Sequence, residues 1–443
     1  MDVAHDGHPA RYEAKFVSSN LSGALTIPST VMDENNQYTF NVTAIDANST
    51  VPNATSVSIP NSVTTINANA FKGNNITSIT IPATVTDIKD GAFSQMKGLT
   101  SINVESGSAK YSATDGVLYE NKTEGKFLIS YPVAKQGTAY GVGGEEFTVP
   151  EGVVGIATNG FQCAATLTRI NLPTTLTQLP TTNEANGFTS ATNLKEIKVA
   201  SGNTAFKDID GVVVTSDGKK LIAYPNNKGG IVDANYDAPT SIDPTHAKAK
   251  GNYYEIPAGV ETIAKGAFAQ VQTITAVKLK DVKKIEEGAF YSVRNLRNVE
   301  ISASVQEIAD GAISGTPDLL GLKVDAGNPY YAADAEGVVY TKDFSELVLY
   351  PSGRTGEYTT HPNTKKIRNR AFYYAQKLTK ITFNSGLEEI GKDVFQGAAS
   401  LKEIEYEPTA TLKKIGTFAF YGTGLEKLTI PASVEEIGWS AFS

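Results

Sequence analysis

Few residues in this chain have the types and spacing that covalent or metal chemistry requires. The one cysteine, Cys163, lies two residues after Phe161 and has no histidine near it in the sequence that could deprotonate its thiol. A single cysteine also excludes an internal disulfide framework and a cysteine-based zinc site. The four histidines are scattered at His5, His8, His246 and His361. We therefore interpret Cys163 as a small structural residue of the core, and we predict no metal site.

Two short motifs resemble ligand loops, but each lacks residues that such a loop needs. Gly141-Val-Gly-Gly is glycine-rich without the six-residue spacing and the strand–helix context of a dinucleotide site. Asp208-Ile-Asp-Gly begins like a calcium loop, yet the remaining acidic ligands and the glutamate at position twelve are absent. We interpret the first motif as a loop and the second as an ordinary Asp-Gly turn, and we predict no cofactor.

Catalytic carboxylates and a serine nucleophile are not indicated either. The pairs Glu388-Glu389 and Glu435-Glu436 occupy the repeat position of Thr64-Thr65, so the repeat explains them better than acid–base catalysis does. No serine lies in a Gly-x-Ser-x-Gly elbow. The sequence therefore predicts no catalytic residue and no enzyme.

Tyrosine is the residue type best suited to recognition here. Three segments, residues 105–148, 200–255 and 325–359, hold 13 of the 20 tyrosines in less than a third of the chain. Exposed tyrosine is a preferred anchor for protein or glycan ligands. Strand propensity alone would also place tyrosines there, and for any single tyrosine we favour packing. Adjacent pairs are better binding candidates, since neighbouring strand residues face opposite ways. The candidate partner-binding residues are Tyr253, Tyr254, Tyr330, Tyr331, Tyr373 and Tyr374.

Composition excludes two classes of partner. Hydrophobic residues make up 40% of the 443, which is enough for a large folded core. The formal charge is −8, from 39 basic and 47 acidic residues, so the chain is poorly suited to nucleic acid. No apolar run approaches the roughly 18–20 residues of a membrane-spanning helix. We predict a monomer with no nucleic-acid partner and no membrane-spanning segment.

The elements that would position any site come from an internal repeat. An apolar residue and proline are followed by Val or Leu, then by Ile, then by Ala-Phe, as in Ile59-Pro60, Val63, Ile66 and Ala70-Phe71. Eleven copies occur, mostly 22 or 23 residues apart. Ten of the 18 phenylalanines occupy one repeat position, and we predict that they form the repeat core. They are Phe71, Phe93, Phe161, Phe188, Phe268, Phe290, Phe372, Phe395, Phe420 and Phe442.

Each copy contains an L-x-x-I-x-I segment, such as Leu99-Thr-Ser-Ile-Asn-Val, whose alternation predicts a short strand with one buried face. The following proline ends the strand, and Ala-Phe predicts a short helical or 3₁₀ turn that packs inward. One copy cannot bury its own apolar residues, whereas stacked copies can, so the repeat predicts a solenoid.

The outward strand positions carry small polar and charged residues without an aromatic anchor, so a partner bound there would make many weak contacts. They are Ser78, Thr80, Ser101, Asn103, Arg169, Asn171, Glu196, Lys198, Ala276, Lys278, Asn298, Glu300, Gly321, Lys323, Lys380, Thr382, Glu403, Glu405, Lys427 and Thr429.

The pattern L-x-x-I-x-I-P-x-S-V-x-x-I-x-x-x-A-F resembles the BspA-type, or Treponema-type, leucine-rich repeat of bacterial surface proteins, from Ile59 to Ser443. The resemblance implies a β-rich α/β solenoid, a curved array of leucine-rich repeats. Two departures are the longer copy at 172–199 and Ile313 in place of phenylalanine. Residues 1–58 are predicted as a degenerate or capping N-terminal repeat and residues 59–443 as the solenoid.

Three islands, residues 105–148, 200–255 and 325–359, do not follow the repeat but resemble one another. Each has an acidic residue, a glycine and a strand-like run, and then a second apolar run that ends in Tyr-Pro. Two such runs joined by a polar segment predict a β-hairpin, so we interpret the islands as modified repeats. The chain ends at Ala441-Phe-Ser, within a repeat and without a polar cap, so we expect it to be part of a longer protein.

Two functions fit the family resemblance and the lack of a catalytic constellation. The leading hypothesis is a non-enzymatic binding module, at the cell surface or secreted, for a protein or glycan ligand of a host or another bacterium. The alternative is a structural spacer that projects another domain from the cell surface. An exposed tyrosine cluster would favour binding, and burial of all the island tyrosines would favour the spacer.

Overall fold

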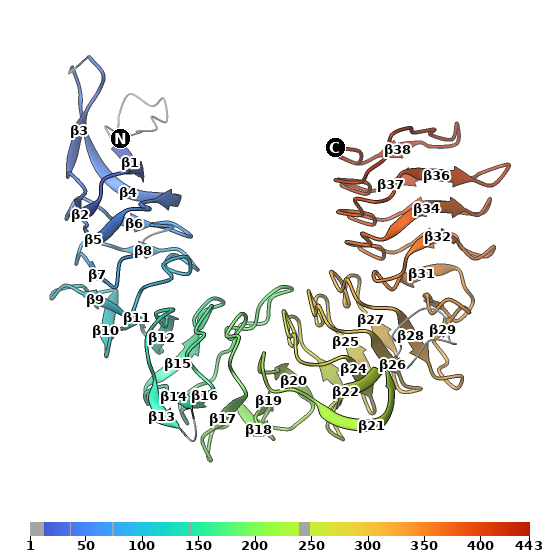
Figure 1. Cartoon of the computed structure of the whole chain (residues 1–443), viewed down its shortest axis with the longest axis horizontal. Coiled ribbons are helices and arrows are strands. Elements are labelled where there is room, and N and C mark those ends of the chain that lie inside the picture. Colours follow the sequence, from blue (N-terminus) through green and yellow to red (C-terminus); the bar gives the residue numbers. More distant parts are fainter. Residues whose placement is uncertain (1–12, 36, 73–74, 141–142, 239–248) are drawn as a thin grey trace. The chain divides into compact units, whose positions relative to one another are not determined.

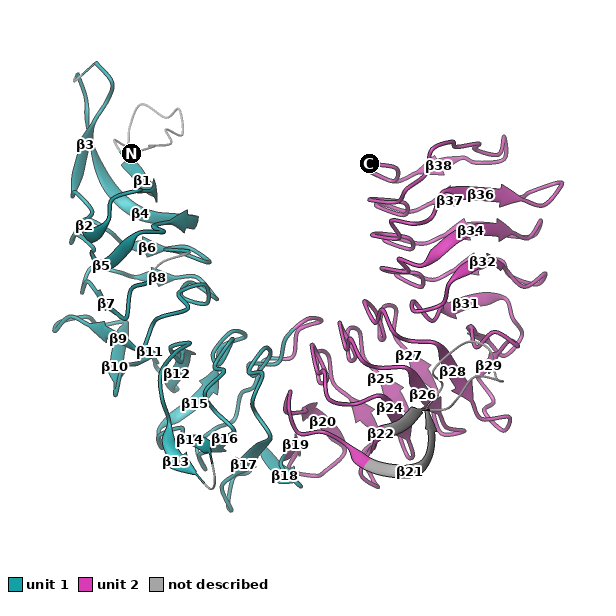
Figure 2. Cartoon of the chain, in the orientation of Figure 1, with its two compact units in different colours: residues 1–180, 185–211 teal, residues 181–184, 212–443 magenta. Residues whose placement is uncertain are grey.

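The computed structural model describes residues 13–35, 37–72, 75–140, 143–238 and 249–443, with only the backbone given for 232–238 and 249–251 (Figure 1). The chain divides into two compact units, residues 1–180 with 185–211, and residues 181–184 with 212–443 (Figure 2). Each unit is a stack of β-coils, as expected of a leucine-rich repeat solenoid.

In the first unit, β1 (Glu13–Ser18), β4 (Thr39–Thr50), β6 (Thr65–Ile66) and β8 (Asp87–Ile88) form one sheet, with β3 (Thr30–Met32) on β4. β2 (Gly23–Thr26) pairs with β5 (Ala54–Ser58), and β7 (Ser78–Ile81) with β9 (Ser101–Val104). A further sheet has the order β10 (Tyr111–Thr114), β11 (Val117–Lys122), β12 (Gly125–Ser130), β15 (Val153–Ile156). Another sheet has the order β13 (Thr138–Tyr140), β14 (Gly144–Thr148), β16 (Arg169–Leu172), β17 (Glu196–Val199). The last strand of this unit is β18 (Phe206–Ile209).

In the second unit, one sheet contains β19 (Val212–Thr215), β20 (Lys220–Ala223), β23 (Thr262–Ile263), β25 (Lys284–Ile285) and β27 (Glu307–Ile308). A second contains β21 (Ile231–Ala238), β22 (Ala249–Glu255), β24 (Ala276–Leu279), β26 (Asn298–Ile301) and β28 (Gly321–Val324). A third contains β29 (Tyr331–Ala333), β30 (Val339–Thr341), β31 (Glu346–Leu349), β33 (Lys366–Ile367), β35 (Glu389–Ile390), β37 (Lys414–Ile415) and β38 (Glu436–Ile437). The last contains β32 (Gly356–Thr359), β34 (Leu378–Phe383) and β36 (Glu403–Tyr406).

The parallel ladders place equal repeat positions side by side. Ile285 of β25 pairs with Ile308 of β27, and the preceding residues, Lys284 and Glu307, form an ion pair at 2.9 Å. This register brings each coil's inward isoleucine onto that of the next coil, while outward charges of opposite sign meet at the surface. In the first unit one buried apolar cluster runs from Ala14 to Leu118, and in the second another runs from Val338 to Ala441.

The α component of the predicted fold class is wrong, because the described residues contain no helix. Around Phe268, for example, Gly266 has φ 64° and Gln270 has φ 60°. Positive φ at these two repeat positions interrupts the run of negative φ values that a helical turn needs. The same pair of positions recurs at Gly288 and Ser292, Gly311 and Gly315, Arg370 and Tyr374, Asp393 and Gly397, and Phe418 and Gly422.

In place of a helix, these turns form a further backbone ladder between coils. The Phe268 N–H donates to the Ala289 carbonyl at 2.8 Å, and the Phe395 N–H donates to the Ala419 carbonyl at 2.7 Å. A turn hydrogen-bonded only within itself would leave such groups unpaired in the interior, which is costly. The ladder thus holds each phenylalanine in position against the next.

The phenylalanine rings stack along the coils, and nine of the ten lie buried, with Phe442 partly buried. Phe268 and Phe290 have ring centroids 4.7 Å apart, and Phe395 and Phe420 lie 5.0 Å apart. Stacked aromatic pairs contribute about 0.5–1.5 kcal/mol beyond the apolar area that they bury. The repeated phenylalanine is therefore the main core side chain of each turn.

The island ranges contain antiparallel pairs whose last strand joins the next coil in parallel. In the third range β29, β30 and β31 pair antiparallel, and β31 then pairs parallel with β33. The Tyr-Pro tyrosine takes the place of the repeat phenylalanine: Tyr131 stacks on Phe161 at 5.5 Å, and Tyr350 stacks on Phe372 at 4.4 Å. Tyr224 stacks on Phe268 in the same way, at 4.9 Å.

Replacing Phe268 by alanine should lower the free energy of unfolding of the second unit by about 3–5 kcal/mol, as for other deletions of a buried aromatic ring. Urea denaturation measures this loss. The control is Tyr330→Ala, at a ring that is 48% exposed, which should cost no more than about 0.5 kcal/mol. A loss below about 1 kcal/mol at Phe268 would show that its ring is not part of a shared core.

Two tyrosines at equivalent island positions form a matched pair for a second prediction. The Tyr119 hydroxyl is buried without a hydrogen-bond partner, whereas the Tyr340 hydroxyl bonds to that of Tyr358 and accepts from the His361 N–H at 3.2 Å. Tyr119→Phe should be neutral or stabilising, while Tyr340→Phe should cost about 1–3 kcal/mol, because it removes the acceptor of the His361 N–H and the hydroxyl bonded to Tyr358. Equal losses in thermal or urea unfolding would contradict this assignment.

Candidate functional site

The first of the three predicted tyrosine pairs is mostly used for packing. Tyr254 is buried, with its ring 4.7 Å from that of Tyr224 and 6.0 Å from that of Phe268. Tyr253 is half-buried, and the Lys278 ammonium lies 3.9 Å from its ring centroid. This pair therefore has one core ring and one ring covered by a cation.

The second pair has one exposed and one buried ring, although only Tyr331 lies on a strand, β29, and Tyr330 precedes it. Tyr330 is exposed, whereas Tyr331 is buried and its hydroxyl accepts a hydrogen bond from the Ile308 N–H at 2.9 Å. Ile308 belongs to β27, the last strand of its ladder, so Tyr331 satisfies a backbone donor that has no further strand to pair with. Tyr111 does the same for Ile88, the end of the β8 ladder, also at 2.9 Å.

The third pair does not lie on a strand, which corrects the expectation of opposite faces. Tyr373 and Tyr374 directly follow Phe372 in the turn, where Tyr374 has φ 56°. Their ring centroids are 4.8 Å apart with planes inclined at 60°. Tyr373 is half-buried and Tyr374 is 41% exposed, so both rings border the same turn edge.

These two rings help to line a groove of about 400 Å³ in the second unit, which we name the Tyr groove. Its volume falls within the range of small-molecule sites. Three coils contribute to it, and its lining residues are Tyr291, Ser292, Arg294, Gly315, Pro317, Tyr373, Tyr374 and Gln376.

The third island brings these coils together. The Arg370 guanidinium forms an ion pair with Glu287 at 3.2 Å, and the Asn369 amide donates to Asp310 at 2.7 Å, although 83 and 59 residues separate the partners. The turns on either side of residues 325–359 thus contact each other directly. Tyr291 and Tyr373, which both follow a repeat phenylalanine, come to line one groove for this reason.

Tyr374 is supported from below by a glycine. A Cβ added to Gly397 would lie 3.2 Å from three ring atoms of Tyr374, Cδ1, Cδ2 and Cε1. Equal distances to both sides of the ring place the Gly397 backbone against its flat face. Since one face is covered and 41% of the residue is still exposed, Tyr374 offers aromatic surface at the groove.

Two tyrosines of the groove, Tyr291 and Tyr373, have raised pKa values. Burial raises the pKa of the Tyr373 phenol and of the Tyr291 phenol, and the nearby Glu184 carboxylate raises the pKa of each further. Both hydroxyls are therefore protonated near neutral pH and act as hydrogen-bond donors and acceptors. Arg370 binds Glu287 and also Asp393, at 3.3 Å, whereas Arg294 is exposed and has no ion pair with any described residue.

Sequence reasoning missed Tyr291, Arg294 and Gln376. One signal was available: Tyr291, Tyr373 and Tyr421 all stand one residue after the repeat phenylalanine. Tyr140, which is not among the candidates, lies at the strand surface with its ring 4.5 Å from the Arg169 guanidinium. Two of the positions predicted to face outward, Ala276 and Asn298, are buried.

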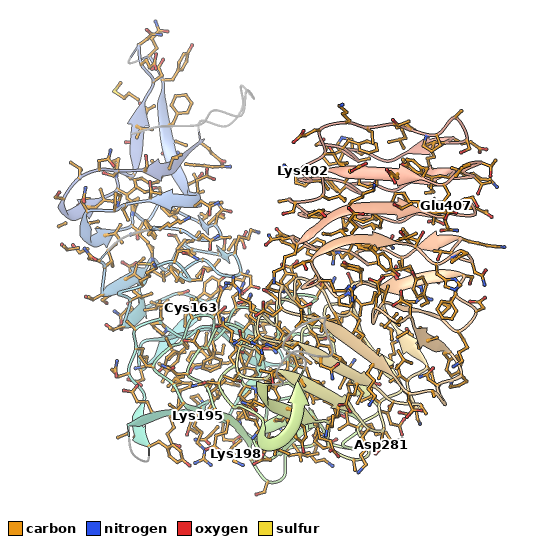
Figure 3. The ribbon with its side chains drawn as sticks, turned by 45° about the vertical axis from the view of Figure 1, so that its right-hand side comes forward. Cys163, Lys195, Lys198, Asp281, Lys402 and Glu407 are labelled. Carbon is orange, nitrogen blue, oxygen red and sulfur yellow. The ribbon has the colours of Figure 1, made fainter. Side chains whose placement is uncertain are left out.

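Two further residues singled out in the sequence are Cys163 and Asp208. Cys163 lies half-buried in the turn after Phe161, and burial raises the pKa of its thiol (Figure 3). Burial alone would raise the pKa of Asp208, but hydrogen bonds from the Val199 N–H, Lys198 and the Gly211 N–H outweigh it and leave this pKa low. Those bonds occupy the carboxylate within the turn.

The predicted carboxylate pairs take part in ion pairs along the ladders. Glu389 pairs with Lys366 at 3.3 Å and Glu436 with Lys414 at 3.0 Å, while Lys413 pairs with Glu388 at 3.7 Å. Lys402 and Glu407, labelled in Figure 3, flank β36, which belongs to the separate sheet of β32, β34 and β36. Exposed pairs of this kind contribute about 0–1 kcal/mol each.

Over the described residues, no group of three or more His, Cys, Asp or Glu side chains could hold a metal ion. Gly141 and Val142 of the glycine-rich loop, His5, His8 and His246 lie outside those residues. The described part of the chain also has no helix that could cross a membrane.

Comparison with known proteins identifies the repeat. The family model described as the BspA-type leucine-rich repeat region matches six copies, over residues 43–121, 140–210, 246–328 and 357–443. No curated protein matches the chain.

Solved structures of similar bacterial repeat proteins cover almost the whole chain. A leucine-rich repeat protein from Eubacterium ventriosum has 19% identity and a TM-score of 0.44, and the match covers 97% of this chain and 90% of that one. A leucine-rich cell surface protein from Faecalibacterium prausnitzii has 18% identity and a TM-score of 0.33, with 92% and 95% covered. The pneumococcal vaccine antigen PcpA has 16% identity and a TM-score of 0.34, with 99% and 78% covered.

The support of Tyr374 by Gly397 can be tested with two glycines at the same repeat position. Gly397 and Gly422 have φ 74° and 67°, but a Cβ at Gly422 would meet only backbone atoms of Gly397, 3.9–4.0 Å away. Each Gly→Ala change should cost about 1–3 kcal/mol for the left-handed backbone. Only Gly397→Ala should also shift the Tyr374 ring resonances in NMR spectra. An unmoved ring, or equal movement in both variants, would contradict the stacked geometry.

Proposed function

Because the chain belongs to the BspA-type leucine-rich repeat family, we propose that it is a non-enzymatic binding module, located at a bacterial cell surface or secreted, that holds a protein or glycan ligand in its Tyr groove. The family suggests a protein-interaction module. The location is proposed from the family resemblance to bacterial surface proteins.

The observation that supports binding is the partly uncovered aromatic lining of the groove. Most island tyrosines are buried, as a spacer would require: Tyr111, Tyr119, Tyr131, Tyr340 and Tyr350 are each less than 5% exposed. Tyr291, Tyr373 and Tyr374 instead line an open groove beside the core. Tyrosine and arginine at a groove are typical of binding hot spots, because they bury large areas and still form hydrogen bonds.

The strand surface is a weaker candidate for the contact. Its outward residues pair with one another: Lys380 binds Glu403 at 3.5 Å and Glu405 at 2.8 Å, and Arg169 binds Glu196 at 3.4 Å. A partner bound there would have to replace these pairs with its own charges, at little net gain. We therefore place the main contact at the Tyr groove.

The proposal predicts that the chain captures at least one ligand from an array of glycans and extracellular-matrix proteins, and that Tyr374→Ala lowers that binding at least about tenfold, as for loss of a hot-spot residue. The control is Tyr38→Ala, which removes a tyrosine of the first unit that is 50% exposed and outside the groove lining, and which should leave binding unchanged. Uniformly negative arrays, or binding that Tyr374→Ala does not alter, would favour the spacer or another face.

A further inference from the structure

We infer that the ligand of the Tyr groove is an acidic saccharide, whose sugar ring stacks on Tyr374 and whose carboxylate binds Arg294. The inference rests on the proposed function, since it names the ligand class of the same groove. Three features of the groove carry it: a flat aromatic surface, polar side chains around that surface, and a guanidinium without an ion pair.

The flat surface is the exposed face of Tyr374. Its other face lies on the Gly397 backbone, so the ring cannot turn edge-on without leaving that support. Tyr373, with its plane inclined at 60°, borders one side. A ring fixed flat with one open face suits a ligand that is itself a ring with an apolar face, such as a pyranose, because little side-chain entropy is lost on binding.

The polar side chains favour a saccharide over a proline-rich peptide, which also docks in aromatic-lined grooves. Ser292 and Gln376 lie in the lining together with the Tyr291 and Tyr373 phenols, which their raised pKa keeps protonated. These groups supply both donors and acceptors. A sugar's adjacent hydroxyls use both kinds, whereas a proline segment has no N–H and offers only carbonyl acceptors.

Charge selects an acidic sugar. Arg294 has no ion pair with the described residues, while Arg370 is already bound by Glu287 and Asp393. The Glu184 carboxylate raises the pKa of Tyr291 more than the Arg370 guanidinium lowers it, so an anion is disfavoured beside Tyr291 and favoured at Arg294. A guanidinium binds a carboxylate through two parallel hydrogen bonds, which gives orientation as well as affinity.

The experiment is calorimetric titration of the full chain with three acidic oligosaccharides: a galacturonic acid hexamer, a hyaluronan hexasaccharide and sialyllactose. Each is compared with its carboxyl methyl ester, which keeps the rings and removes the charge. At least one acid should bind about tenfold or more tightly than its ester, the expected effect of one charge-assisted bidentate contact. Added salt should weaken the acid more than the ester.

Variants at two groove residues separate the two contacts. Arg294→Gln should lower the affinity for the acid to that for the ester and leave the ester unaffected. Tyr374→Ala should abolish binding of both, and Tyr374→Phe should retain both, because the ring surface remains. The control is Tyr38→Ala, at an exposed tyrosine outside the groove lining, with wild-type affinities expected.

Failure of this inference differs from failure of the proposed function. Binding of none of the three acids, equal affinity for acid and ester, or tighter binding of a decaproline peptide would overturn the acidic saccharide. If the array still shows a ligand whose capture depends on Tyr374, the binding module stands with another ligand class.

Discussion

A repeat phenylalanine in this protein is covered on its flat faces by the rings of neighbouring coils, and no coil could supply that cover for itself. Phe395, for example, lies between Phe372 at 4.7 Å and Phe420 at 5.0 Å. The turn that carries the ring is held by hydrogen bonds to the next coil instead of by a helix of its own. Stacking and the turn ladder therefore act together, and stability in each unit comes from contacts between neighbours.

The islands keep this constraint while changing the rest of the coil. A tyrosine before proline fills the phenylalanine place, so the aromatic row continues from Tyr350 into Phe372. The turn edges before and after the third island then meet through Arg370 and Glu287. The Tyr groove forms at this junction, where three coils contribute side chains to one turn edge. A feature that serves packing thus also creates the one surface that we assign to binding.

The repeat could be read from the sequence because its signal is local and recurs eleven times. The short strands and the inward isoleucines follow from the alternation. The turn conformation could not be read in this way, since Ala-Phe suggests a helical turn and the left-handed residues are often not glycine, as at Arg370, Asp393 and Phe418. The groove was also out of reach, because it depends on contacts such as that between Asn369 and Asp310, which no local pattern encodes. Tyr373 and Tyr374 were selected as a strand pair, and they line the groove as turn residues.

Amide hydrogen exchange at the turns tests the central claim most directly. If the turns of neighbouring coils are joined by a backbone ladder, the N–H groups of Phe268, Phe290, Phe372 and Phe395 should exchange as slowly as those of the strands beside them, because each donates to the next coil. Exchange at these four residues as fast as in exposed loops, with the strands still protected, would contradict the account.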